Sequence, residues 1–219
     1  MTIDSILQQQ SMYYQELLVA QHKVSRIIEH QLSKGELREQ FVKDIVCKHY
    51  RHLSFHKGIL VVDNWQSPQI DFIWLIPDSG IGMLGMFRAD ECKLFMEIKS
   101  EAKKDEIKYF NDYTCTIKKL CPKANIKAGM FCYSTQVSRQ IILKDFGFKY
   151  DRNIRAYKAY DKAVDLYRSI DFVYVLDLKS SVKHPYFIMR DIFGNNSLFF
   201  DDPVIDYFLK LFKGEVSNG

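Results

Sequence analysis

The sequence predicts an α/β or α+β domain in which a central mixed β-sheet is flanked by helices and preceded by an N-terminal helix. The 219 residues are 47% hydrophobic and 26% charged, which is enough apolar material for one domain with a modest extension. Helix-like and strand-like periods alternate along the chain. No repeat, low-complexity tract or Gly/Ser linker separates them. Together these features favour helices packed on one sheet.

Two helices are predicted first. Apolar residues recur at helical spacing over residues 3 to 32, and no proline interrupts them. The Ser-Lys-Gly sequence at residues 33 to 35 then breaks the pattern, and a second helix is expected over about residues 36 to 49. Within that helix, Glu39 is expected to pair with Lys43, four residues further along.

The sheet and its remaining helices are expected after residue 51. A turn is predicted at residues 64 to 68, and a loop or poorly formed hairpin at residues 78 to 90, which hold three glycines. Strands are predicted at residues 52 to 63, 69 to 77, 93 to 99, 126 to 134 and 172 to 178. Helices are predicted at residues 101 to 120, 135 to 146 and 203 to 212.

Composition excludes several classes of protein. The apolar runs are far shorter than the roughly 20 residues of a spanning helix, so no membrane partner is expected. Residues 1 to 10 lack the basic and apolar regions of a secretory signal, and we expect a soluble, cytoplasmic protein. Five scattered cysteines without a C-x-x-C pair indicate reduced thiols. The net charge of +4 permits a phosphate-bearing partner without demonstrating one.

One Glu-x-Lys pair stands out from the four in the chain. Three of them lie in a charged helical stretch or at a loop edge, whereas Glu97 and Lys99 lie in an apolar strand. Because strands have period two, Phe95, Glu97 and Lys99 share one face. Burying unpaired charge is costly, so Glu97 and Lys99 must be compensated by a metal ion, by another ion pair or by each other.

The preceding predicted strand supplies a second carboxylate, Asp71, among apolar residues. If the two strands are neighbours, Asp71 and Glu97 converge on one site. Two carboxylates suit Mg²⁺, a hard ion that keeps waters and binds substrate phosphate. Lys99 could orient an attacking water or stabilise developing negative charge.

These residues resemble a known signature. PQID at residues 68 to 71, followed by EIK at residues 97 to 99, is similar to the PD-(D/E)XK motif of restriction-endonuclease-like nucleases. With GELRE at residues 35 to 39, the resemblance to an uncharacterised bacterial branch covers about residues 33 to 135. It departs from the pattern in three ways: the proline lies three residues before Asp71, 25 residues separate Asp71 from Glu97, and residues 145 to 219 match nothing.

The resemblance implies a Mg²⁺-dependent (or Mn²⁺-dependent) endonuclease that hydrolyses phosphodiester bonds in DNA, in a setting of bacterial anti-phage defence. It implies that Asp71 and Glu97 bind the metal and that Lys99 serves the water. Glu36 would be the first-helix acid near the metal, and Gln69 would line the site. The chain would divide into an N-terminal helix (residues 1 to 32), a nuclease-like core with a restriction-endonuclease-like fold (33 to 145) and a C-terminal extension on the same domain (146 to 219).

Several alternatives stay open. Asp71, Glu97 and Lys99 could form a structural ion-pair network. Glu36 could be a helix N-terminal acid favoured by the dipole, and Gln69 could bond to backbone. The chain could also be a catalytically silent nuclease-fold module that binds nucleic acid or a protein. Residues 3 to 32 could instead assemble a homodimer or a larger complex.

Two further groups have plainer interpretations. Cys47, His49, His52 and His56 could suggest zinc, but structural zinc ligands usually come in pairs from separate elements, and a solvated junction is favoured. Cys132, which could be a thiol nucleophile, has the sequence context of a core residue. Two aromatic clusters could stack bases, although core packing is the safer interpretation: Tyr150, Tyr157, Tyr160 and Tyr167, and Phe199, Phe200 and Phe208.

Overall fold

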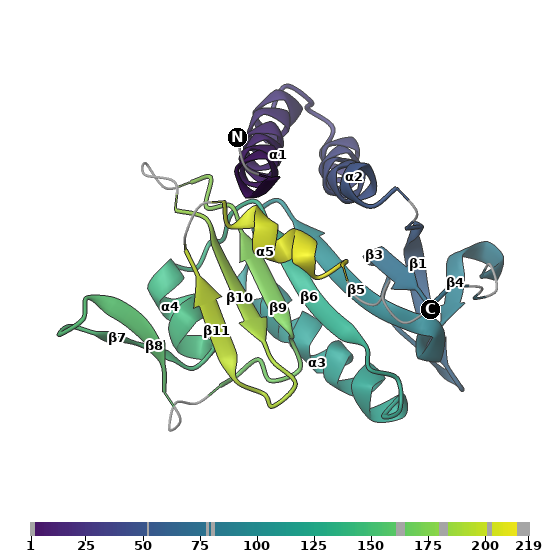
Figure 1. The fold of residues 1–219 in the computed structure, drawn as a ribbon. Helices are drawn as coiled ribbons and strands as arrows, with labels where there is room; N and C mark the ends of the chain where they lie inside the picture. Colours follow the sequence, from purple (N-terminus) through teal and green to yellow (C-terminus); the bar gives the residue numbers. More distant parts are fainter. Residues whose placement is uncertain are drawn as a thin grey trace.

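A mixed nine-stranded β-sheet forms the centre of the molecule (Figure 1). The computed structural model describes residues 3–51, 53–77, 79, 82–160, 165–179, 184–200 and 203–213. The strand order is β11-β10-β9-β6-β5-β3-β1-β2, and β4 pairs with β1. The strands are β1 (Phe55–Val62), β2 (Trp65–Gln66), β3 (Ile70–Leu75), β4 (Met86–Arg88), β5 (Cys92–Lys99), β6 (Lys127–Cys132), β9 (Phe172–Val175), β10 (Tyr186–Arg190) and β11 (Asn196–Phe199).

Helices cover both faces of this sheet. In Figure 1, α5 crosses the near face below α1 and α2, while α3 and α4 lie behind the strands. A separate two-stranded hairpin projects from the side that carries α4. The helices are α1 (Ile3–Ser25), α2 (Gln31–His49), α3 (Lys104–Leu120), α4 (Arg139–Asp145) and α5 (Ile205–Lys210), with 3₁₀ turns η1 (Met83–Gly85) and η2 (Ala89–Glu91). The hairpin consists of β7 (Phe148–Asp151) and β8 (Ala156–Ala159).

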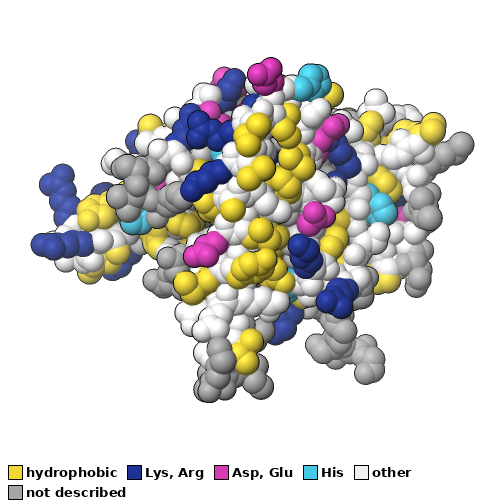
Figure 2. Space-filling view, turned by 90° about the horizontal axis from the view of Figure 1, so that it is seen from above, with side chains coloured by type: hydrophobic (Ala, Val, Ile, Leu, Met, Phe, Trp, Pro, Cys, Tyr) yellow, Lys and Arg dark blue, Asp and Glu magenta, His cyan; other side chains and the backbone are white. Residues whose placement is uncertain are grey.

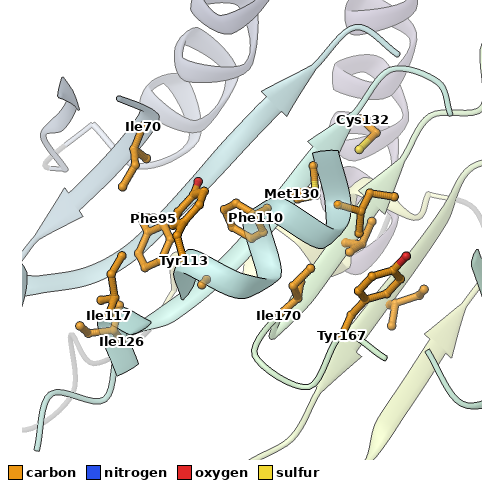
Figure 3. Close-up of a cluster of buried hydrophobic side chains, with 14 of the residues drawn as sticks. Ile70, Phe95, Phe110, Tyr113, Ile117, Ile126, Met130, Cys132, Tyr167 and Ile170 are labelled. Atoms are coloured by element: carbon orange, nitrogen blue, oxygen red, sulfur yellow. The ribbon is translucent and has the colours of Figure 1, made fainter. Parts of the chain in front are cut away.

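Side chains of the central strands pack alternately in two hydrophobic cores, one on each face of the sheet. Met96 on β5 packs in the cluster shared with α1, α2 and α5. Phe95, its neighbour, packs with Phe110 and Tyr113 of α3 on the opposite face (Figure 3). The period of two predicted for this strand is therefore confirmed, and the face that carries Phe95 is the one that also carries Glu97 and Lys99.

The predicted fold class is confirmed. The described chain has a central mixed sheet flanked by helices, and an N-terminal helix precedes it. The described helices include none long and apolar enough to cross a membrane. Exposed apolar side chains gather over α1 (Figure 2), where Ile6 and Tyr13 are about half exposed. An assembly role for this helix stays a prediction.

The boundary between the first two helices was predicted wrongly. The first helix ends at Ser25 and the second begins at Gln31, so residues 33 to 35 lie inside α2. Ser25 ends α1 because its hydroxyl donates to the His22 carbonyl at 2.7 Å and accepts from Arg38 Nε at 2.8 Å. Glu36 is therefore not at a helix N-terminus.

Six short strands were not predicted. The second strand lies in the expected turn and the fourth in the expected loop, and the other four lie in the stretch after residue 146. All six have two to five residues, which is too short for a clear alternation of apolar and polar side chains. They are β2, β4, β7, β8, β10 and β11.

Candidate active site

Two antiparallel strands bring Asp71 and Glu97 together. Phe72 on β3 pairs with Met96 on β5, which sets the two carboxylates opposite each other. Asp71 Oδ2 accepts a hydrogen bond of 2.9 Å from the Ile98 backbone N–H. Both carboxylates are buried, at 9% and 6% exposure. The two strands are thus neighbours, as the sequence-based hypothesis required.

Glu97 is held at both oxygens. Lys99 Nζ lies 2.7 Å from Oε2, and the Tyr113 hydroxyl donates to Oε1 at 2.8 Å. Tyr113 comes from α3, whose buried stripe also contains Phe110 and Ile117 (Figure 3). Sequence analysis missed Tyr113 because its spacing is that of an ordinary core residue.

Burial and neighbouring charges shift the pKa values of three groups around Glu97. Burial and the nearby Glu97 carboxylate raise the pKa of Asp71 to about 6, while the Ile98 N–H and Lys99 oppose this rise. Burial lowers the pKa of Lys99, but Glu97 and Asp71 outweigh burial, and the net pKa is raised. Burial and Glu97 also raise the pKa of Tyr113, which keeps its hydroxyl a donor.

A second cation approaches Asp71 from β1. Lys57 Nζ lies 4.0 Å from Asp71 Oδ1 and 2.5 Å from Oε2 of Glu39 on α2. Glu39 was predicted to pair with Lys43 at helical spacing; its charge does act on Lys43, but its ion pair is with Lys57. The ammonium of Lys57 on the facing strand is the partner of Glu39 instead. Lys57 and Glu39 therefore extend the cluster from the sheet to α2.

The two remaining predicted residues lie at the edge of this cluster. Glu36 is exposed on α2, and among the described residues it makes no ion pair with Lys57 or Lys99. Its carboxylate raises the pKa of Lys57 less than Glu39 and Asp71 do. Glu39, one turn further along the helix, is the acid that α2 supplies.

Gln69 is exposed and lines an open pocket. The pocket has a volume of about 390 Å³ and lies over the part of the cluster formed by Glu97 and Lys99. Its other walls come from the start of β3 and from α3: Pro68, Asp105, Glu106, Tyr109, Phe110 and Tyr113. A polar ligand could therefore reach Glu97 and Lys99 from solvent.

The donor set suits a hard divalent cation. Among the described residues there is no group of three or more His, Cys, Asp or Glu side chains that could hold a metal ion. Mg²⁺, however, is commonly held by one or two carboxylates together with waters and substrate phosphate. Asp71 and Glu97 supply such a pair, and the raised pKa of Asp71 indicates negative charge that a cation would offset. The residues present therefore fit Mg²⁺ or Mn²⁺.

The other candidate groups pack as ordinary side chains. The His49 ring lies 4.6 Å from the Tyr50 ring, the His56 ring lies 5.0 Å from the Phe87 ring, and His52 lies outside the described residues. None of the five cysteines is in a disulfide. Cys132 is buried in the core, where burial raises the pKa of its thiol to about 12.

Solved structures share this fold. The cAAA-bound form of NucC from P. aeruginosa ATCC27853 aligns with a TM-score of 0.64 and 15% identity, over 99% of this chain and 93% of that one. The cAAA-bound form of E. coli MS115-1 NucC gives 0.64 and 15%, over 96% and 92%. Its apo form gives 0.54 and 12%, over 91% of each chain. No family model matches the chain, and neither does any curated protein.

Proposed function

We propose that this chain is a metal-dependent nuclease of the PD-(D/E)XK kind that hydrolyses phosphodiester bonds in DNA. One observation carries the proposal. Neighbouring strands set two buried carboxylates, Asp71 and Glu97, opposite each other, with the Lys99 ammonium 2.7 Å from the second. The fold shared with NucC supports it, as does the match of these residues to the PD-(D/E)XK signature.

Asp71 and Glu97 would hold the divalent cation. When bound, such an ion neutralises charge on the scissile phosphate and lowers the pKa of water. The chain's own contribution is geometric. The Ile98 N–H and the Tyr113 hydroxyl each anchor one oxygen of a carboxylate, which fixes the direction of its remaining lone pairs.

Lys99 would act on the substrate side. Its ammonium stays charged because Glu97 and Asp71 raise its pKa. It lines the open pocket, where it can orient a water or stabilise charge that develops on a phosphate oxygen. Gln69, exposed at the rim of the same pocket, would position the substrate backbone.

We propose a biological setting of bacterial anti-phage defence. The motif resemblance suggested this setting, and the shared fold with NucC is consistent with it. A catalytically silent binding module is the competing function. The two functions differ in DNA cleavage, since a silent module binds DNA without cutting it.

Cleavage of linear and plasmid DNA, measured with Mg²⁺, with Mn²⁺ and with EDTA, tests the proposal. We expect the variants Asp71→Asn, Glu97→Gln and Lys99→Met each to lower the cleavage rate by about 100-fold or more, the loss typical of a preorganised charge-stabilising group. The matched control is Glu91→Gln with Lys93→Ala. This pair has the same spacing but lies where η2 ends and β5 begins, at the other end of the strand.

Thermal melts of every variant show whether it is folded. Folded Glu97→Gln protein that cleaves at the wild-type rate contradicts the proposal. Wild-type protein that binds DNA but cuts it with neither metal favours the silent module.

A further inference from the structure

The β7–β8 hairpin is a separate arm on the side of the molecule that carries α4 (Figure 1). Its two strands are held by backbone pairing and by Tyr150 opposite Tyr157, whose ring centroids lie 5.1 Å apart. Such cross-strand aromatic pairs stabilise hairpins. Tyr160 lies beyond the end of β8 and takes no part in this pair. The Tyr150–Tyr157 pair therefore does not explain the aromatic ring at Tyr160.

The arm is strongly basic. Residues 144 to 160 contain five Lys or Arg and two Asp. One of these acids, Asp145, forms an ion pair with Lys104 of α3, with 3.0 Å between Oδ2 and Nζ. Lys and Arg side chains gather at the end of the molecule that the hairpin forms (Figure 2). All five cations are exposed: Lys144, Lys149, Arg152, Arg155 and Lys158.

Three hollows meet at Tyr160. The first, of about 500 Å³, extends along α4 past Lys144, and the second, of about 430 Å³, runs along the hairpin past Arg152 and Lys158. The third, of about 600 Å³, reaches Arg168 and the turn between β10 and β11. Tyr160 is half exposed, yet its position is fixed because its backbone N–H donates to the Gly147 carbonyl at 3.0 Å.

The Tyr160 ring carries a cation at its face. Lys149 Nζ lies 5.4 Å from the ring centroid, within cation–π range. An exposed aromatic ring flanked by exposed cations is the arrangement with which proteins bind unpaired nucleic acid, because bases stack on the ring while Lys and Arg follow the phosphates. A duplex keeps its bases stacked on one another and leaves no face free for such a ring.

The first hollow lies next to the candidate active site. Its wall includes Asp145, the partner of Lys104. Lys104 is the first residue of α3, and the next two residues, Asp105 and Glu106, line the pocket over Glu97. The Lys104–Asp145 ion pair therefore links the start of α3, which borders the pocket over Glu97, to the wall of the first hollow.

We propose that the three hollows around Tyr160 bind an unpaired DNA strand that continues from the candidate active site. Tyr160 stacks a base, and Lys149, Arg152 and Lys158 contact phosphates. This inference rests on the proposed function in one respect: DNA is taken as the ligand because it is the proposed substrate. Its physical content, binding of a single strand to this arm, does not depend on cleavage.

Fluorescence anisotropy with labelled oligothymidylate, in EDTA to prevent cleavage, tests the arm directly. We expect Tyr160→Ala to weaken binding by roughly 5- to 150-fold, the range that base–aromatic stacking gives on alanine substitution. Tyr160→Phe keeps the ring and should bind like wild type. Arg152→Ser with Lys158→Ser should reduce the slope of log affinity against log salt by about 0.7 for each phosphate that the protein no longer neutralises. Lys48→Ala, an exposed cation on α2, is the charge control.

A duplex of the same length serves as the second probe. Wild-type protein should bind it less tightly than the single strand, and Tyr160→Ala should affect duplex binding little. Equal affinity of Tyr160→Ala and wild type for oligothymidylate overturns the proposal, as does a wild type that binds no oligothymidylate. Loss of cleavage in Glu97→Gln with hairpin-dependent binding retained supports both proposals. Binding that depends on the hairpin in a chain that never cuts DNA supports the arm alone.

Discussion

Replacing Asp71 with asparagine should stabilise the metal-free protein while abolishing its activity. Burial and Glu97 raise the pKa of Asp71 from 3.8 to about 6. An acid whose pKa is raised in the folded state binds its proton more tightly there. The contribution of Asp71 to the free energy of unfolding is therefore fully present below its pKa in the unfolded chain. It is lost as the pH rises through its pKa in the folded protein. This rise in the pKa of Asp71 corresponds to about 3 kcal/mol.

Asparagine has nearly the same shape and never ionises, so it avoids this loss. We expect Asp71→Asn to be more stable than wild type by up to about 3 kcal/mol near pH 8, and equally stable below about pH 4, where both side chains are neutral. Urea unfolding followed by circular dichroism, in EDTA, measures both values. Adding Mg²⁺ should reduce the difference, because only the wild-type carboxylate binds the ion.

A control separates burial from simple loss of charge. Asp112→Asn replaces an exposed carboxylate on α3 and should leave the free energy of unfolding near pH 8 close to that of wild type. If Asp71→Asn is no more stable than wild type near pH 8, neither burial nor the Glu97 carboxylate disfavours the charged form of Asp71 in the fold. The reasoning that connects their geometry to a cation site is then refuted.

Three further substitutions test the hydrogen bond that holds Glu97 and the backbone at two glycines. Tyr113→Phe removes the donor to Glu97 Oε1, and we expect the Mg²⁺ concentration needed for half-maximal cleavage to rise by about 10- to 100-fold, the usual effect of losing such an orienting bond; an unchanged metal titration contradicts this. Gly35→Ala should raise the free energy of unfolding by about 0.5–1 kcal/mol, because a Cβ there meets nothing within 4 Å inside α2. Gly129→Ala should lower it by about 1–3 kcal/mol, because its Cβ would lie 2.4 Å from the Phe172 ring. Urea unfolding of both variants shows whether the signs are opposite.

The central strands could be predicted from the sequence because their side chains alternate between two faces, and each face packs in its own core. The alternation around Glu97 predicted which side chains share its face, and the structure agrees. Strand neighbours could be inferred only conditionally, since periodicity says nothing about which strands pair. Helix ends were harder to predict. The end of α1 depends on a contact between Ser25 and Arg38, thirteen residues apart, which no local pattern reveals.

The support of the candidate site was less predictable than its centre. Asp71 and Glu97 were conspicuous because each is a charge in an apolar strand. Lys57 and Glu39 were not conspicuous, because each lies in a half-buried position where charge is ordinary. Their ion pair also joins residues that are 18 positions apart on two different elements. The nearer partner, Lys43, was the local expectation, and tertiary geometry overrode it.

The charges of the assembled cluster explain why this site should take a cation together with a phosphate. Three carboxylates, from Glu39, Asp71 and Glu97, contact two ammonium groups, from Lys57 and Lys99. With these five groups ionised, one negative charge remains among them, and burial together with the Glu97 carboxylate raises the pKa of Asp71. A divalent cation alone would overcompensate that charge, whereas a divalent cation bound with one phosphodiester would balance it. The cluster should therefore bind metal more tightly when DNA is present, and the reverse also holds, since coupling between two ligands is reciprocal.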